Sequence, residues 1–116
     1  MRPGAQSPEE LETLFEDAFL MRDRDAVGEL FEDRAVMAAG ARRDARGGEE
    51  IERLVAELWG RGRLYLAHAT RVLQARDTAL VVAHCGVHVV RRGGDGAWRY
   101  AISLLAVDDP NPKEDR

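Results

Sequence analysis

The sequence predicts one α+β domain, with helices in its first half and a curved antiparallel sheet in its second. Apolar residues recur at helical spacing through the first half of the chain, whereas from Arg63 onward they alternate with a period of two. With 116 residues the chain can form one hydrophobic core but not two. We therefore expect a single domain over residues 8–109, between an N-terminal tail, 1–7, and a charged, mobile tail, 110–116.

Capping residues and apolar faces predict three helices. Ser7 and Glu10 form a capping box at the start of the first helix, which is expected over about 8–21. Asp25 is the expected N-cap of a short second helix, and a third helix is expected over about 49–59. Each helix is apolar on one face only, so all three need a sheet to pack against.

Alternation with a period of two predicts the strands. A short strand and a weak polar strand come first and three long strands follow, over about 35–39, 41–46, 63–75, 78–91 and 97–107. The segment Gly-Gly-Asp-Gly at 93–96 is the expected hairpin turn before the last strand, because glycine adopts the positive φ values that such turns need.

Composition and charge argue against several classes of protein. The net charge is −4, so a nucleic-acid partner is not expected. A single cysteine, Cys85, excludes an internal disulfide and a Cys-rich zinc site. No segment approaches the roughly 20 apolar residues of a membrane span. We expect a cytoplasmic protein with no membrane partner and no cofactor.

The order of these elements and two sequence segments resemble a known superfamily. Phe-Glu-Asp-Arg-Ala-Val at 31–36 follows the second helix, and Arg-Arg-Gly-Gly-Asp-Gly-Ala-Trp-Arg-Tyr at 91–100 spans the last hairpin. Over about residues 8–109 the chain resembles the nuclear transport factor 2-like superfamily, and within it the bacterial SnoaL-like and ketosteroid isomerase-like proteins.

The resemblance implies a cone-shaped, cystatin-like α+β roll, in which a curved sheet wraps the helices and leaves a deep apolar pocket at one end. It also implies a homodimer formed through the sheet. Members include isomerases, polyketide cyclases, dehydratases and proteins that only bind, so the fold does not select a reaction. Two departures stand out. Ala38 or Ala39 takes the place of the isomerases' aspartate general base, and the sheet half looks one hairpin shorter.

Two histidines are the candidate acid/base residues. If 78–91 is one strand, His84 and His88 share a face with Leu80, Val82 and Val90. Histidine titrates near neutral pH, so either could act in a pocket, and the alternative is a structural, hydrogen-bonded role. We favour His88, because the resemblance places a polar oxyanion donor near this position.

A metal site is not expected at these histidines. Four residues along a strand span roughly 13 Å, so His84 and His88 cannot bind the same ion. His68 faces His84 only if the loop between their strands has three residues, and a two- or four-residue loop would place Cys85 there instead.

Aromatic residues are the candidate lining of a pocket. The set is Phe15, Phe19, Trp59, Tyr65 and Tyr100. The alternative is that these rings form the core or an interface. Our leading hypothesis is a small-molecule pocket protein, possibly an isomerase, cyclase or dehydratase acting on a polyketide-like or other apolar metabolite. The alternative hypothesis is a non-catalytic, dimeric binding or accessory domain.

Overall fold

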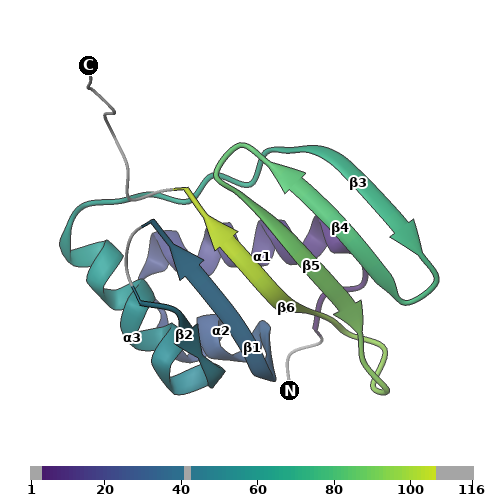
Figure 1. Ribbon diagram of the computed structural model, residues 1–116, viewed down its shortest axis with the longest axis horizontal. Helices are drawn as coiled ribbons and strands as arrows, with labels where there is room; N and C mark the ends of the chain where they lie inside the picture. Colours follow the sequence, from purple (N-terminus) through teal and green to yellow (C-terminus); the bar gives the residue numbers. More distant parts are fainter. Residues whose placement is uncertain (1–3, 41–42, 107–116) are drawn as a thin grey trace.

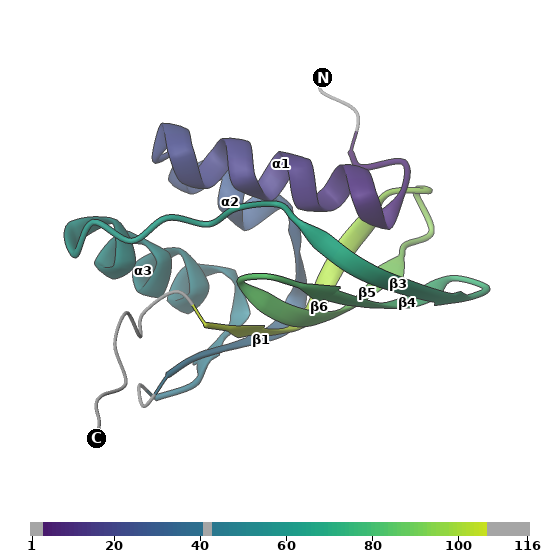
Figure 2. The same cartoon turned by 90° about the horizontal axis from the view of Figure 1, so that it is seen from above.

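The computed structural model describes residues 4–40 and 43–106. The domain has two layers, and α1 lies across one face of the sheet (Figure 1). Figure 2, turned by 90°, shows α1 and the strands as separate layers. The elements are α1 (Pro8–Met21), α2 (Arg24–Glu29), β1 (Phe31–Ala39), β2 (Ala45–Arg46), α3 (Gly47–Gly60), β3 (Ala69–Ala75), β4 (Thr78–Ala83), β5 (Gly86–Arg92) and β6 (Trp98–Leu105). The predicted α+β class is confirmed.

Local signals set the helix boundaries. The Ser7 hydroxyl accepts a hydrogen bond from the Glu10 backbone N–H at 3.0 Å, and α1 covers the predicted 8–21. The prediction that Asp25 caps α2 is wrong. Asp23 caps this helix, because its backbone is extended and its carboxylate accepts the Ala26 N–H at 3.1 Å, while Asp25 lies in the first turn.

The sheet has the strand order β2-β1-β6-β5-β4-β3. Neighbouring strands run antiparallel except β1 and β6, which are parallel, so the sheet is mixed and not wholly antiparallel as predicted. The first strand begins at Phe31, earlier than the predicted 35. Of the predicted strand 41–46, only Ala45 and Arg46 form β2, and residues 41–42 lie outside the described residues.

The predicted single strand over 78–91 is in fact a hairpin. β4 ends at Ala83, His84 and Cys85 form a two-residue turn, and β5 begins at Gly86. Neither of the two turn residues is typical of hairpin turns and neither has a positive φ, so the one turn signal in the sequence is Gly86, which follows them directly. This pair of strands is the hairpin that the sequence analysis had counted as missing.

The predicted strand 63–75 is shorter than expected. β3 begins only at Ala69, and residues 61–68 are neither helix nor strand. This segment, which we call the strap, runs from α3 to β3 along one edge of the molecule, between the helix layer and the sheet (Figures 1 and 2). Its Tyr65 side chain is buried, whereas Leu64 and Leu66 are exposed.

The described part of the N-terminal segment packs on the sheet. Ala5 is buried and forms an antiparallel bridge with Trp98, so residues 4–7 do not form a free tail. The predicted mobile tail, 110–116, lies outside the described residues. Within the described ranges, no helix is long and apolar enough to cross a membrane.

Candidate functional site

The hairpin at His84 and Cys85 decides which side chains face the core. Val81 pairs with His88 across β4 and β5, and His88 pairs with Ser103 across β5 and β6, so these three side chains lie on the inner face. All three are buried. The prediction that His88 shares a face with Leu80 is therefore wrong, because the two-residue turn reverses the chain between them.

The two histidines have different environments. His84 lies in the turn, where its side chain is exposed and its backbone N–H donates to the His68 carbonyl at 3.0 Å. The loop between β3 and β4 has two residues, but an irregularity in β3 still brings His68 beside His84. Only His88 lies in the interior, with 1% of its surface exposed.

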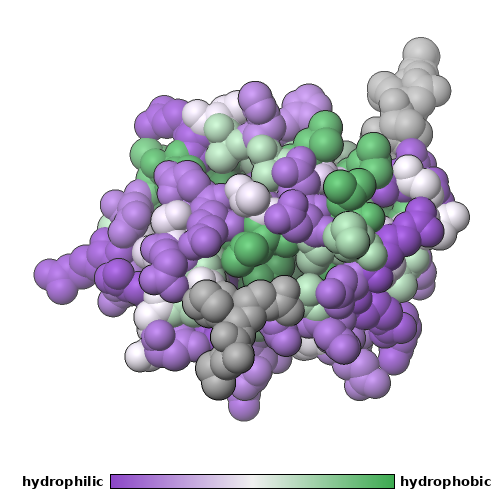
Figure 3. Space-filling view, turned by 180° about the vertical axis from the view of Figure 1, so that it is seen from behind, coloured by the Kyte–Doolittle hydropathy of each residue, from purple (hydrophilic) through white to green (hydrophobic). Residues whose placement is uncertain are grey.

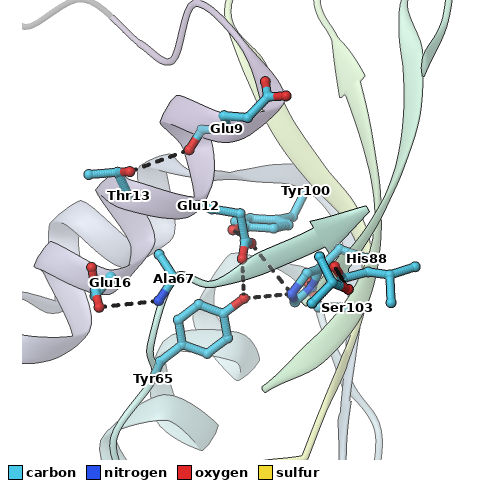
Figure 4. A network of polar contacts seen from close by, with 11 residues as sticks. Glu9, Glu12, Thr13, Glu16, Tyr65, Ala67, His88, Tyr100 and Ser103 are labelled. Atoms are coloured by element: carbon cyan, nitrogen blue, oxygen red, sulfur yellow. Dashed lines mark hydrogen bonds and ion pairs between the residues drawn. The ribbon is translucent and has the colours of Figure 1, made fainter. Parts of the chain in front are cut away.

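Five polar side chains form one buried network inside the cone (Figure 4). The Glu12 carboxylate, on α1, accepts hydrogen bonds from the Tyr65 hydroxyl at 2.6 Å and from the Tyr100 hydroxyl. His88 Nε2 lies 2.8 Å from the Tyr65 hydroxyl, and His88 Nδ1 lies 2.9 Å from the Ser103 hydroxyl. His88 Nε2 is also 3.5 Å from Glu12 Oε2. We call these residues the interior network.

Gly86 makes room for the imidazole of this network. A Cβ atom at Gly86 would lie 3.2 Å from the His88 ring and 2.6 Å from the Leu104 carbonyl oxygen. The second distance is too short for any side chain to be accommodated without a backbone shift. The absence of a side chain at Gly86 thus allows the His88 ring and β6 to approach the start of β5 closely.

One arrangement of protons satisfies every hydrogen bond in the interior network. Both phenols donate to the Glu12 carboxylate, and Tyr65 then accepts from His88 Nε2–H. His88 Nδ1, without a proton, accepts from the Ser103 hydroxyl. In this arrangement Glu12 is ionised and His88 is a neutral imidazole, so Tyr65 links the two.

Burial shifts the ionisation of the whole network. Desolvation raises the pKa of Glu12 above its usual value, although the bonds from Tyr100 and Tyr65 oppose the shift. Desolvation lowers the pKa of His88 to about 4, which keeps the imidazole neutral at physiological pH. Burial and the nearby Glu12 carboxylate raise the pKa of Tyr65 and of Tyr100, so both phenols remain donors.

Of the predicted pocket aromatics, Tyr65 and Tyr100 belong to this network, and Phe15 and Phe19 pack around them. The ring centroids of Phe15 and Tyr65 are 4.6 Å apart, and those of His88 and Tyr100 are 4.8 Å apart. Phe19 packs against Trp59 at 5.9 Å. All five predicted aromatic residues are buried, which is the core arrangement named as the alternative. Their role as ligand contacts stays a prediction.

Glu12 and Ser103 are polar residues of the site that the sequence analysis missed. Glu12 precedes Phe15 and Phe19 by three and seven residues, so it lies on the apolar face of α1. Ser103 alternates with the buried Ala101 and Leu105 on the inner face of β6. A single polar residue within an otherwise apolar stripe is the signal that could have revealed both.

Two buried donors near the strap have no partner among the described residues. They are Trp59 Nε1 and Arg63 Nε, at the end of α3 and the start of the strap. The residues that the structure describes contain no group of three or more histidine, cysteine, aspartate or glutamate side chains able to hold a metal ion.

Comparisons with known proteins identify the fold. No family model and no curated protein matches the chain. Solved structures do match. A ketosteroid isomerase-like protein from Erwinia carotovora atroseptica aligns with a TM-score of 0.70 at 18% identity, over 88% of this chain and 94% of that one. A nuclear transport factor 2-like protein with a cystatin-like fold from Novosphingobium aromaticivorans gives 0.65 at 19% identity, over 89% and 80%.

A third match is a protein of unknown function with a cystatin-like fold from Nostoc punctiforme, with a TM-score of 0.68 at 17% identity, over 89% of this chain and 90% of that one. Identities this low establish the fold and leave the reaction open. The chain therefore has the cystatin-like α+β fold of the ketosteroid isomerase-like and nuclear transport factor 2-like proteins.

Proposed function

We propose that this chain binds an apolar small molecule with a carbonyl group inside the cone and transfers a proton on it, as an isomerase, cyclase or dehydratase would. The observation that carries the proposal is the interior network, in which a buried carboxylate lies beside a neutral imidazole. Proton abstraction next to a carbonyl needs such a base and a nearby donor for the oxygen.

The energetics of the network support a functional role. A buried carboxylate loses its hydration, and apolar residues of similar volume often give equal or greater stability at such positions. Ionisable groups whose pKa values are shifted by burial are also common at functional sites. If Glu12 and His88 had only a structural role, leucine or phenylalanine would fill the same space without the cost of burying polar groups.

The Tyr65 hydroxyl indicates where the ligand would lie. It donates to Glu12 Oε1 at 2.6 Å and accepts from His88 Nε2–H at 2.8 Å. An enolisable ketone presents the same two functions, a proton for a base and an oxygen for a donor. In our proposal Glu12 removes the proton from carbon, the His88 N–H stabilises the oxyanion, and Glu12 returns the proton to another carbon of the ligand.

Ligand entry requires the strap to move, because Tyr65 fills the interior. The strap is held by the Tyr65 hydroxyl bonds to Glu12 and His88, and its backbone is fixed at Ala67, whose N–H donates to Glu16 at 3.2 Å. The His68 carbonyl at its end also accepts from the His84 N–H at 3.0 Å, so entry must break or shift these bonds. Gly62, with a φ of 74°, lies at its start. The unpartnered Trp59 Nε1 is a further donor available to a ligand oxygen near this end.

Exchange of α-protons tests the proposal without knowledge of the natural substrate. In D₂O, the protein should accelerate deuterium incorporation into an apolar ketone such as 2-tetralone, measured by proton NMR. Glu12→Gln should reduce the protein-dependent rate by roughly 10²- to 10⁴-fold, because the base is lost. Tyr65→Ala should increase ketone affinity by vacating the interior.

A matched control is Glu9→Gln, since Glu9 is exposed on the same helix and outside the network. This variant should exchange deuterium at the wild-type rate. The enzyme proposal fails if apolar ketones bind inside the cone of wild type and of Tyr65→Ala yet exchange no faster than in buffer.

A second candidate is a non-catalytic, dimeric binding or accessory domain, and two observations favour it. Every polar group of the interior network already has a partner, and all five residues are buried. The outer face of the sheet meanwhile exposes apolar side chains that a second copy could cover; these are Leu73, Leu80, Val87, Ile102 and Leu104. We propose the homodimer under both functions, and a cytoplasmic location remains a prediction.

A further inference from the structure

A second concave surface lies outside the cone, beside α1. Figure 3 views the molecule from behind, which is the side of the helix layer. It is a groove of about 730 Å³ between α1, α2, the N-terminal segment and the hairpin that joins β5 to β6. Small-molecule sites typically measure roughly 300–1,000 Å³. No residue of the interior network lines this groove, so it is separate from the candidate site described above.

The floor of the groove is apolar. Ala18, Leu30 and Ala97 are buried there, and Leu14 is partly buried on α1. Met21, at the end of α1, is 74% exposed and extends the apolar surface at the edge. The floor can therefore take a hydrocarbon group out of water without any change in the core.

The rim of the groove is acidic. Among the described residues that line it, the carboxylates are Asp17, Asp23, Glu29 and Asp95, and the one cation is Arg99. Arg99 donates two hydrogen bonds to Asp95, at 3.1 and 2.8 Å, so these two charges neutralise each other. Asp17 is exposed and has no ion pair with any residue that the structure describes. The described lining residues therefore carry a net negative charge, to which the exposed Asp17 contributes.

We infer that this groove binds a small organic cation with an apolar body, such as an alkylammonium compound. The apolar floor provides the burial and the carboxylates provide the charge complementarity, while an anion of the same shape is repelled. The site goes beyond the proposed function, because it uses another surface and a ligand of different charge.

The test is a titration of the ¹⁵N-labelled protein with hexyltrimethylammonium, followed by NMR. We expect saturable shifts of backbone amides over residues 14–30 and 95–99. Hexanoate, with a similar chain and the opposite charge, should give no saturable shift. Raising the salt concentration from about 20 to about 200 mM should weaken binding several-fold, because the carboxylates are exposed.

Chain length and two variants separate this site from simple ion attraction. Affinity should rise from tetramethylammonium to hexyltrimethylammonium, by up to roughly fourfold for each added methylene that is buried. Asp17→Asn should weaken binding at least threefold, and Met21→Lys at least tenfold, with folding retained because both residues are exposed. The control Glu9→Gln, on α1 but outside the groove, should bind as wild type does.

Three results would overturn the inference. One is equal binding of hexanoate and hexyltrimethylammonium, and another is affinity that does not depend on chain length. The third is a pattern of shifts confined to the outer sheet face around Leu73 and Leu80, which would show that the alkyl chain seeks any exposed apolar surface.

Discussion

Strand β6 buries a polar residue on its inner face and exposes apolar residues on its outer face, which is the reverse of the usual distribution. Ser103, on the inner face, is 1% exposed, whereas its neighbours Ile102 and Leu104, on the outer face, are 53% and 54% exposed. The same inversion continues on β5, where His88 faces inward and Val87 faces outward. The inner polar groups are satisfied by one another, but the outer apolar groups have no cover among the described residues.

From this comparison we expect the inner face to govern the arrangement and stability of the core, and the outer face to govern association. Hydrogen-bonded polar groups inside a core give it a specific arrangement, and leaving one of them unpaired is costly. Exposed apolar rows instead favour association. Pairing places Leu80, Val89 and Ile102 in one row across three strands, so the outer residues form a continuous surface.

The largest expected effect comes from charging the outer face. If the chain forms the proposed homodimer, the double variant Ile102→Glu and Leu104→Glu should raise its dissociation constant on the order of a thousandfold, because each copy would bury two unpaired charges. Sedimentation velocity at several concentrations measures this. The monomer should keep its fold, since both side chains are exposed. A wild-type protein that is monomeric at all concentrations would refute the dimer.

Removing the inner carboxylate should lower stability strongly. Glu12→Ala leaves the hydroxyls of Tyr65 and Tyr100 without their acceptor and creates a cavity, so the free energy of unfolding should fall by about 2–4 kcal/mol. Urea denaturation provides the measurement. Ile102→Ala is the matched change on the outer face, and under conditions where the protein is monomeric it should cost less than about 1 kcal/mol. Equal losses would remove the contrast between the faces.

The pH dependence of stability should identify His88. Its pKa is lowered from 6.5 to about 4 by burial, so the unfolded chain binds a proton more readily than the folded one. The contribution is complete above pH 6.5 and is lost as the pH falls toward 4, by up to about 3 kcal/mol.

Glu12 acts in the opposite direction, because its raised pKa means that stability is lost as the pH rises through that pKa. Denaturation curves of His88→Gln and Glu12→Gln between pH 4 and 8 separate the two effects. His88→Gln should abolish the loss of stability on acidification that comes from the imidazole. If the free energy of unfolding of this variant depends on pH as steeply as that of the wild type, another group causes the effect.

The smallest effect is expected at the other histidine. His84 is exposed in the turn between β4 and β5, and its only described bond there uses its backbone N–H. His84→Gln should therefore change stability by less than about 0.5 kcal/mol and leave ketone exchange unchanged. A large loss of exchange in this variant, with His88 intact, would place the chemistry outside the interior network.

Sequence reasoning was most successful where short-range signals decide the structure. The N-cap at Ser7, the three apolar helix faces and the glycine-rich turn at 93–96 all involve residues within a few positions of one another. The second half of the predicted capping box differs, because the Glu10 carboxylate accepts from the Gln6 N–H and not from that of Ser7. His88 and the five aromatics were also identified as candidates, because such residues are conspicuous in apolar segments. Glu12 was missed, since its partners Tyr65 and Tyr100 lie 53 and 88 residues away.

The sequence by itself determined the fold class, the helices and the last hairpin, because these follow from local hydrogen bonding and from the period of the apolar pattern. Only the tertiary structure decided which side of each strand became the interior. The largely apolar segment 78–91 permits either one strand or a hairpin, and the turn at His84 and Cys85 fixed the choice. That turn reverses the chain, so it directed His88 toward Glu12 and left His84 in solvent, which residue spacing alone could not reveal.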